Sequence, residues 1–233
     1  MLRAVFCAIL FAGAVTLPNV DTVRRELESR YRGAKTLKAA FFERYSDGNG
    51  GVVAASGTVY FSRPGRMRWD YQSPQEKVFL VDGTNAWFYV PADHTASRVR
   101  MKKSSDWRTP LALLVGKAEL SQLCRRLDLV APGQPNSDEQ LLEPGDSLLR
   151  CIPRDNSQAD SSDTRVARPY VLLETDPKAQ LVRVVIREPG TVETEFRFGN
   201  WEENIPIPEV KFHFQPPPGV AIVDEESLAN EIR

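Results

Sequence analysis

The sequence has little of the chemistry that most enzymes need. Its 233 residues include only two histidines, and neither has a cysteine, an aspartate or a second histidine at a spacing that suits a metal ion: His94 and His213. A Gly-x-Ser-x-Gly nucleophile motif and a glycine-rich phosphate loop are also missing. Asp70, Asp82 and Asp93 are expected in turns or on a polar strand face, where a carboxylate is usually solvated. These absences argue against metal-dependent, triad-type and nucleotide-dependent enzymes, and we expect no catalytic residue, no metal site and no cofactor.

The sequence also lacks a large excess of charge of one sign and a long apolar run. The formal net charge of −1 gives no long-range attraction to nucleic acid or to anionic lipid. The most apolar run, residues 4–14, is too short to span a bilayer. Because Arg3 precedes this run and Ala-Gly-Ala ends it, residues 1–14 are predicted to be a secretory signal peptide, followed by a single domain at 15–233. Cys7 lies inside the run rather than at its end, so we expect an exported, soluble chain without a lipid anchor.

Cysteine is scarce, and only Cys124 and Cys151 follow the predicted signal. Strands predicted at residues 125–130 and 147–153 are neighbours in sequence, and their pairing as a hairpin would bring the two thiols together. An even pair of cysteines in an exported chain is typical of a disulfide. Two reduced, buried thiols are the alternative that the sequence leaves open.

The elements that the sequence does predict are mostly β-strands. One helix is expected from Asp21, a residue type that caps helices, to Gly33, because Val23, Leu27 and Tyr31 recur at helical spacing. Strands are expected around residues 37–42, 58–61, 66–71, 78–81, 86–90, 125–130, 147–153, 170–175, 181–188, 192–198 and 210–214. Short hairpin turns between many strands predict a mainly β (α+β) fold, an antiparallel sheet that curls into a barrel or half-barrel.

A second, unusual helix is predicted in the middle of the chain. Thr109 suits an N-cap, Pro110 suits the first helical position, residues 111–115 are all apolar, and Gly116 can end the helix. A helix without a polar face must be buried or must cover something apolar. Further on, the polar stretch 154–168 is expected to be a surface loop.

Aromatic residues are concentrated in the predicted strands: Trp69, Tyr71, Trp87, Phe88, Tyr89, Phe196, Phe198, Phe212 and Phe214. Strand alternation places Met67, Trp69 and Tyr71 on one face. Residue type alone favours a packed core, whereas a large curled sheet can also enclose a lined cavity. Composition does not distinguish the two.

Several landmarks occur in an order that resembles one family. They are GTVYFSRPGRMRWDY (57–71), VDG (81–83), WFYVP (87–91), TP (109–110), FHFQPP (212–217) and GV (219–220). This ordered set covers most of the chain after the signal and resembles the LolA family of outer-membrane lipoprotein carriers. The departures are the cysteine pair and the polar insert at 154–168, and neither falls on a landmark.

The resemblance implies an incomplete antiparallel β-barrel with a helical lid over an apolar lipid cavity. The residues then expected to line that cavity are Met67, Trp69, Tyr71, Trp87, Tyr89, Leu111, Leu113 and Leu114. It also implies a monomeric periplasmic chaperone without enzyme chemistry. Such a chaperone takes lipoproteins by their acyl chains from an inner-membrane ABC transporter and passes them to an outer-membrane receptor.

The resemblance also gives Arg63 a role as a lid lock. An arginine before Pro-Gly would otherwise be expected to be a solvated turn residue. Arg63 matches the family's arginine that hydrogen-bonds backbone carbonyls of the lid, and a guanidinium offers five donors in a rigid fork.

Two other functions stay open from the sequence. A module of the same architecture could carry a glycolipid or another amphiphile, or could report on the state of the envelope. An enzyme acting on lipids would need a nucleophile and a base in the cavity, and the sequence offers no candidate pair.

Overall fold

The structure is a computed structural model that describes residues 19–101, 113–116, 118–130, 142–154 and 169–224. The predicted signal peptide, Leu111 and the polar insert after Arg154 lie outside these ranges. The helical segments are α1 (Val20–Arg32), α2 (Leu120–Leu123) and the 3-10 turns η1 (Pro91–Asp93), η4 (Pro189–Thr191) and η5 (Glu209–Phe212). The strands are β1 (Thr36–Ser46), β2 (Val52–Ser62), β3 (Arg66–Ser73), β4 (Lys77–Val81), β5 (Asn85–Val90), β6 (Thr95–Arg100), β7 (Cys124–Leu129), β8 (Ser147–Pro153), β9 (Tyr170–Thr175), β10 (Leu181–Arg187), β11 (Glu193–Glu203) and β12 (Ala221–Asp224).

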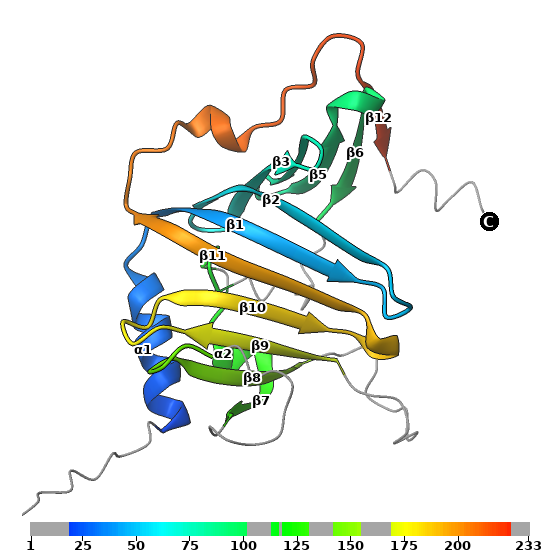
Figure 1. The fold of residues 1–233 in the computed structure, drawn as a ribbon. Helices are drawn as coiled ribbons and strands as arrows, with labels where there is room; N and C mark the ends of the chain where they lie inside the picture. Colours follow the sequence, from blue (N-terminus) through cyan, green and yellow to red (C-terminus); the bar gives the residue numbers. More distant parts are fainter. Residues whose placement is uncertain (1–18, 102–112, 117, 131–141, 155–168, 225–233) are drawn as a thin grey trace, which may run out of the picture.

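The strands form one sheet in the order β12-β6-β5-β4-β3-β2-β1-β11-β10-β9-β8-β7 (Figure 1). Among the described strands, β12 and β6 pair in parallel and all other neighbours pair antiparallel. The edge strands β12 and β7 are not hydrogen-bonded to each other, so the sheet does not close. The prediction of a mainly β fold with an incomplete antiparallel barrel is confirmed.

Helix α1 lies across one end of β8, β9 and β10 (Figure 1). Its predicted apolar residues do form the buried side: Val23, Leu27 and Tyr31. The helix begins earlier than predicted, because the side chain of Asn19, not that of Asp21, caps it by accepting a hydrogen bond from the Asp21 backbone N–H. The hydroxyl of Tyr31 accepts a hydrogen bond of 3.0 Å from the backbone N–H of Leu181, which fixes α1 to the start of β10.

The two faces of the sheet follow from its register. Directly paired residues of antiparallel strands lie on the same face. Trp69 of β3 pairs with Val59 of β2 and Phe79 of β4, and Phe41 of β1 pairs with Phe198 of β11. We call the face that carries these five side chains the inner face. Most of the hydrophobic core, including the buried side of α1, lies there.

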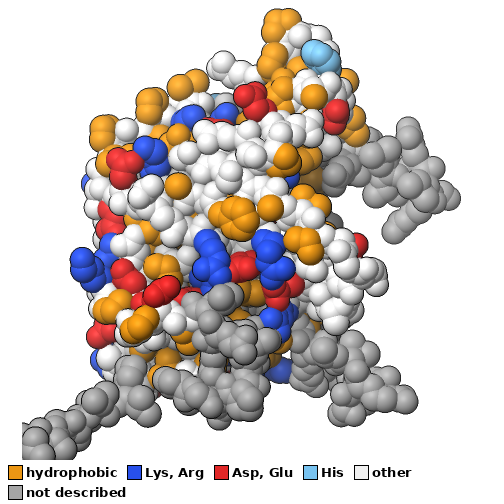
Figure 2. Space-filling view, viewed as in Figure 1, with side chains coloured by type: hydrophobic (Ala, Val, Ile, Leu, Met, Phe, Trp, Pro, Cys, Tyr) orange, Lys and Arg blue, Asp and Glu red, His pale blue; other side chains and the backbone are white. Residues whose placement is uncertain are grey.

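The opposite, outer face of β1 and β9–β11 is charged, and it faces the viewer in Figures 1 and 2. Arg183 and Glu174 form an ion pair there with side chains that are 5% and 4% exposed. Arg44 reaches Glu195 across the strands at 3.2 Å. Positive and negative side chains are mixed on this face (Figure 2).

The C-terminal region differs from the prediction. A strand was expected at residues 210–214, but the chain forms the turn η5 instead. Prolines at 206, 208 and 216–218 remove the backbone donors that a strand ladder needs. Residues 204–220, which we call the C-terminal arm, instead lie on the outer face of β3 and β5, and β12 then adds to β6 (Figure 1). Neither β6 nor β12 was predicted.

Candidate functional site

The centre of the inner face is a packed floor of aromatic rings. Trp69 is 2% exposed, and its ring centroid lies 4.8 Å from that of Phe41, 5.1 Å from Phe196 and 6.1 Å from Phe198. Such edge-to-face and tilted contacts are favourable between aromatic rings. The described floor is therefore a packed core rather than an open cavity.

A short turn belongs to the same hydrophobic cluster as this floor. Residues 113–116, which we call the cover turn, are held by a hydrogen bond of 3.1 Å from the Gly116 N–H to the Leu113 carbonyl. Leu113 and Leu114 are 3% and 0% exposed and belong to the same hydrophobic cluster as Met67 and Trp69. This turn is the described part of the helix expected at 111–115. Leu111 and the rest of that helix lie outside the described residues.

Arg63 lies directly against the cover turn. Gly116 has a φ of +70°, and a Cβ added to it would come within 2.2 Å of Arg63 Nε. The neighbouring Gly65 donates its backbone N–H to the Val115 carbonyl at 2.8 Å, while Arg63 Nη1 donates to the Ala34 carbonyl at 3.4 Å. Burial lowers the pKa of Arg63, so its charge is held partly out of water. The contact joins Arg63 to the cover turn, and the lock itself stays a prediction.

The register corrects two of the expected cavity residues. Phe88 pairs with Phe79 and therefore lies on the inner face, so its neighbours Trp87 and Tyr89 lie on the outer face. There they pack on Phe214 of the C-terminal arm, at centroid distances of 4.9 Å and 5.5 Å. Phe88 was not predicted as a site residue. Counting outward from the turn at 82–85 would have found it, because that turn fixes which residues pair.

The apolar floor ends in a polar rim. Tyr71, the third predicted residue of β3, is partly buried and pairs with Lys77, whose amine lies 4.2 Å from the centre of the Tyr71 ring. Burial, and then the nearby charge of Glu43, raise the pKa of Tyr71, so its hydroxyl stays protonated. Phe88 is 42% exposed although it lies on the inner face. The inner face is therefore apolar at its centre and carries polar groups at this edge.

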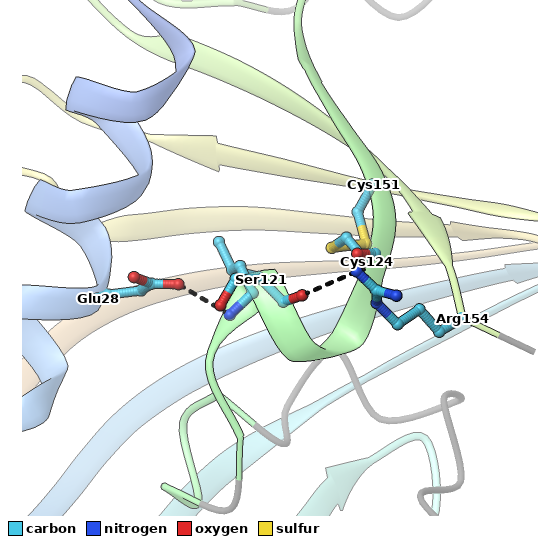
Figure 3. Close-up of a disulfide and its surroundings, with 6 residues drawn as sticks. Glu28, Ser121, Cys124, Cys151 and Arg154 are labelled. Carbon is cyan, nitrogen blue, oxygen red and sulfur yellow. Dashed lines mark hydrogen bonds between the residues drawn. A yellow bond between two sulfur atoms is a disulfide. The ribbon is translucent and has the colours of Figure 1, made fainter.

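The chain that follows the cover turn is firmly anchored (Figure 3). The carboxylate of Glu28, a 4% exposed residue of α1, accepts a hydrogen bond of 2.9 Å from the backbone N–H of Leu120, the first residue of α2. At the end of α2, Cys124 forms a disulfide with Cys151 of β8. Arg154 donates to the Cys124 carbonyl at 3.1 Å. The start and the end of α2 are thus both fixed to neighbouring elements.

The described part of the chain holds no cluster of three or more histidine, cysteine, aspartate or glutamate residues that could bind a metal ion. His94 and His213 are both exposed. Within the same ranges, no helix combines the length and the apolar character needed to cross a membrane.

Comparisons with known proteins agree with this arrangement. The family model of the outer membrane lipoprotein carrier protein LolA matches residues 32–147. A protein of Nitrosospira multiformis named outer-membrane lipoprotein carrier protein is 27% identical, over 94% of this chain and 97% of its own. This chain belongs to the LolA family. A relative of the same name from Xanthomonas axonopodis is 26% identical over 95% of this chain and 93% of its own. A solved LolA superfamily protein from Nitrosomonas europaea has 8% identity, with a TM-score of 0.43, over 85% of this chain and 99% of its own.

The match covers part of the described site. Arg63, Met67, Trp69, Tyr71 and the cover turn all lie within residues 32–147. The C-terminal arm and β9–β12 lie beyond that range. The LolA family consists of carrier proteins.

Proposed function

We propose that this LolA-family chain is a periplasmic carrier that binds the acyl chains of lipoproteins on its inner face. In this proposal, residues 1–14 direct export and are removed. The carrier receives its cargo from an inner-membrane transporter and passes it to an outer-membrane receptor, without catalysing a reaction. The names of the relatives as outer-membrane lipoprotein carriers support this role.

One observation carries the proposal: an unclosed sheet presents an aromatic inner face beneath a short cover turn. The floor around Trp69 is apolar, and it ends at the partly exposed Phe88 and at a polar rim. Removal of the cover turn would uncover the area now filled by Leu113 and Leu114, which are almost fully buried. An acyl chain is a chemical match for the side chains it would replace.

The energetics explain why such a carrier is needed. Each acyl methylene taken out of a membrane costs about 0.8 kcal/mol, so a lipoprotein with two or three chains does not cross water unaided. The carrier must replace most of that burial and still release the cargo. A floor that is already packed when empty meets this demand, because the cost of displacing the cover turn offsets part of the binding energy.

In the same proposal Arg63 sets that cost. Its guanidinium packs on the cover turn in the closed, empty state. A hydrogen bond to a charged group contributes about 1.5–3 kcal/mol, so a few bonds from Arg63 to backbone carbonyls of the turn would hold it closed without making it immovable. Cargo that enters must break these contacts, and their re-formation favours onward transfer.

The test is a two-step transfer experiment. The purified protein is mixed with inner-membrane vesicles that hold a labelled lipoprotein, and then with outer-membrane vesicles. We expect wild type to release and deliver the lipoprotein, Arg63→Leu to accept it but deliver it poorly, and Arg63→Lys to recover only part of the delivery. If wild type releases no lipoprotein while a different amphiphile co-purifies with it from the periplasm, the proposal is wrong. Delivery by Arg63→Leu at the wild-type rate would refute only the proposed role of Arg63 as a lid lock.

A further inference from the structure

The buried side chain of Trp69 carries one hydrogen-bond donor, its indole Nε1–H. Its side chain is buried, yet no acceptor among the described residues lies within hydrogen-bond distance of its indole Nε1. Two other tryptophans are paired. Trp87 Nε1 donates to Asp82 at 3.0 Å, and Trp201 Nε1 donates to the Leu181 carbonyl at 2.9 Å. Buried donors are nearly always paired, so the unpaired indole at the centre of the inner face needs an explanation.

The position of Trp69 suggests what the missing acceptor is. One row deeper on the inner face, Met67 pairs with Phe61 and Val81, and all three are apolar and buried. One row outward, Tyr71 pairs with Lys77 at the polar rim. Trp69 therefore lies where an apolar environment gives way to a polar one. In an acylated ligand, the same change occurs at the ester or amide group that joins each hydrocarbon chain to the rest of the molecule.

We propose that the Trp69 indole N–H donates a hydrogen bond to an ester or amide carbonyl of the bound acyl ligand. This inference rests on the proposed function and adds the polar group that the inner face recognises. The tail then lies toward Met67, and the ligand's polar part points toward Tyr71 and Lys77. A carbonyl is uncharged, so it enters the apolar floor at a much smaller desolvation cost than a carboxylate would. The bond satisfies a donor that no described residue pairs.

The first test observes the indole directly in the wild-type protein. The four tryptophans are labelled with 15N, and the Trp69 cross-peak is assigned from its loss in Trp69→Phe. The protein is titrated with methyl palmitate and, separately, with hexadecane, which has no carbonyl. Methyl palmitate is expected to move the Trp69 indole proton downfield, whereas hexadecane is not. The indoles of Trp87 and Trp201 are internal controls, because their protons are already bonded.

The second test measures affinity. Trp69→Phe keeps a ring and removes a donor that makes no bond in the empty protein. Its preference for methyl palmitate over hexadecane is expected to fall about tenfold relative to wild type, which corresponds to about 1.4 kcal/mol. Trp87→Phe, on the outer face, is the matched control and should keep the wild-type preference.

The outcomes separate this inference from the proposed function. If wild type binds neither probe, the acyl carrier function is refuted and this inference with it. If wild type binds both probes while the Trp69 indole proton stays in place, only the inference is overturned. If Trp69→Phe keeps the wild-type preference for methyl palmitate over hexadecane, the inference is also overturned. A downfield shift of the Trp69 indole proton that is seen only with methyl palmitate supports the inference.

Discussion

Replacement of Gly116 by alanine probes the contact between Arg63 and the cover turn. The new Cβ would lie 2.2 Å from Arg63 Nε and 2.6 Å from Nη2, distances that must open beyond 3.0 Å. Arg63 is a flexible side chain, so it moves aside and its packing against the cover turn is lost. We therefore expect the cover turn to open more often, and a loss of about 1.4 kcal/mol corresponds to a tenfold increase.

Backbone strain alone would also weaken the variant, so a matched control is needed. Gly83 has a φ of +103°, and a Cβ there meets only Arg66 Cγ, at 3.8 Å. Alanine at a left-handed position costs about 1–3 kcal/mol in either variant. The difference between Gly116→Ala and Gly83→Ala therefore isolates the contact with Arg63.

The assay is delivery of a labelled lipoprotein from the loaded carrier to outer-membrane vesicles. Gly116→Ala is expected to accept cargo and to deliver it as poorly as Arg63→Leu, and the double variant should be no worse than Arg63→Leu alone. Gly83→Ala should deliver at the wild-type rate. Equal delivery by Gly116→Ala and Gly83→Ala would refute the reasoning.

Three further results are expected. Protein made in an oxidising compartment should show no free thiol from Cys124 or Cys151 after denaturation, and replacing both with serine should cost roughly 3 kcal/mol in urea unfolding; two free thiols would contradict the bridge. Glu28→Ala should lower stability by about 1–3 kcal/mol because it leaves the first backbone N–H of α2 buried without an acceptor; an unchanged urea midpoint would show that water replaces the carboxylate. Burial, and then the charge of Glu174, raise the pKa of Asp146 to about 6 from 3.8. The folded state then binds more protons, so the Asp146 contribution to stability should fall as the pH rises from about 4 to 6. Asp146→Asn should remove that slope in unfolding measured across this range.

Much of the fold could be predicted from local patterns. The alternation in β1–β5 and the turn at 82–85 gave the antiparallel order, because short turns leave few other pairings. The buried side of α1 was also predictable, because Val23, Leu27 and Tyr31 recur at helical spacing. The C-terminal arm was not predictable in this way. The alternation around Phe212 looks like a strand, but Phe212 packs under the Arg66 guanidinium, a contact made only in the folded chain.

The site was predicted only in part, because local patterns show which residues of one strand share a face but not which distant segments meet. Met67, Trp69 and Tyr71 share one strand, so alternation alone gives their common face. Trp87 and Tyr89 were assigned by residue type, and only the register across two hairpins shows that Phe88 takes the inner position. The contact between Arg63 and Gly116 joins distant parts of the sequence, and no local pattern reveals it.

The central claim is that acyl chains bind the inner face, and a photo-crosslinking comparison tests it most directly. Phe88 on the inner face is 42% exposed and Phe42 on the outer face is 43% exposed, so a photoreactive phenylalanine analogue is equally accessible at either position. Each labelled carrier is loaded with a lipoprotein bearing radioactive acyl chains and is then irradiated. We predict that the label is captured at position 88 and not at position 42. Equal capture at both positions, or capture at 42 alone, would contradict the account.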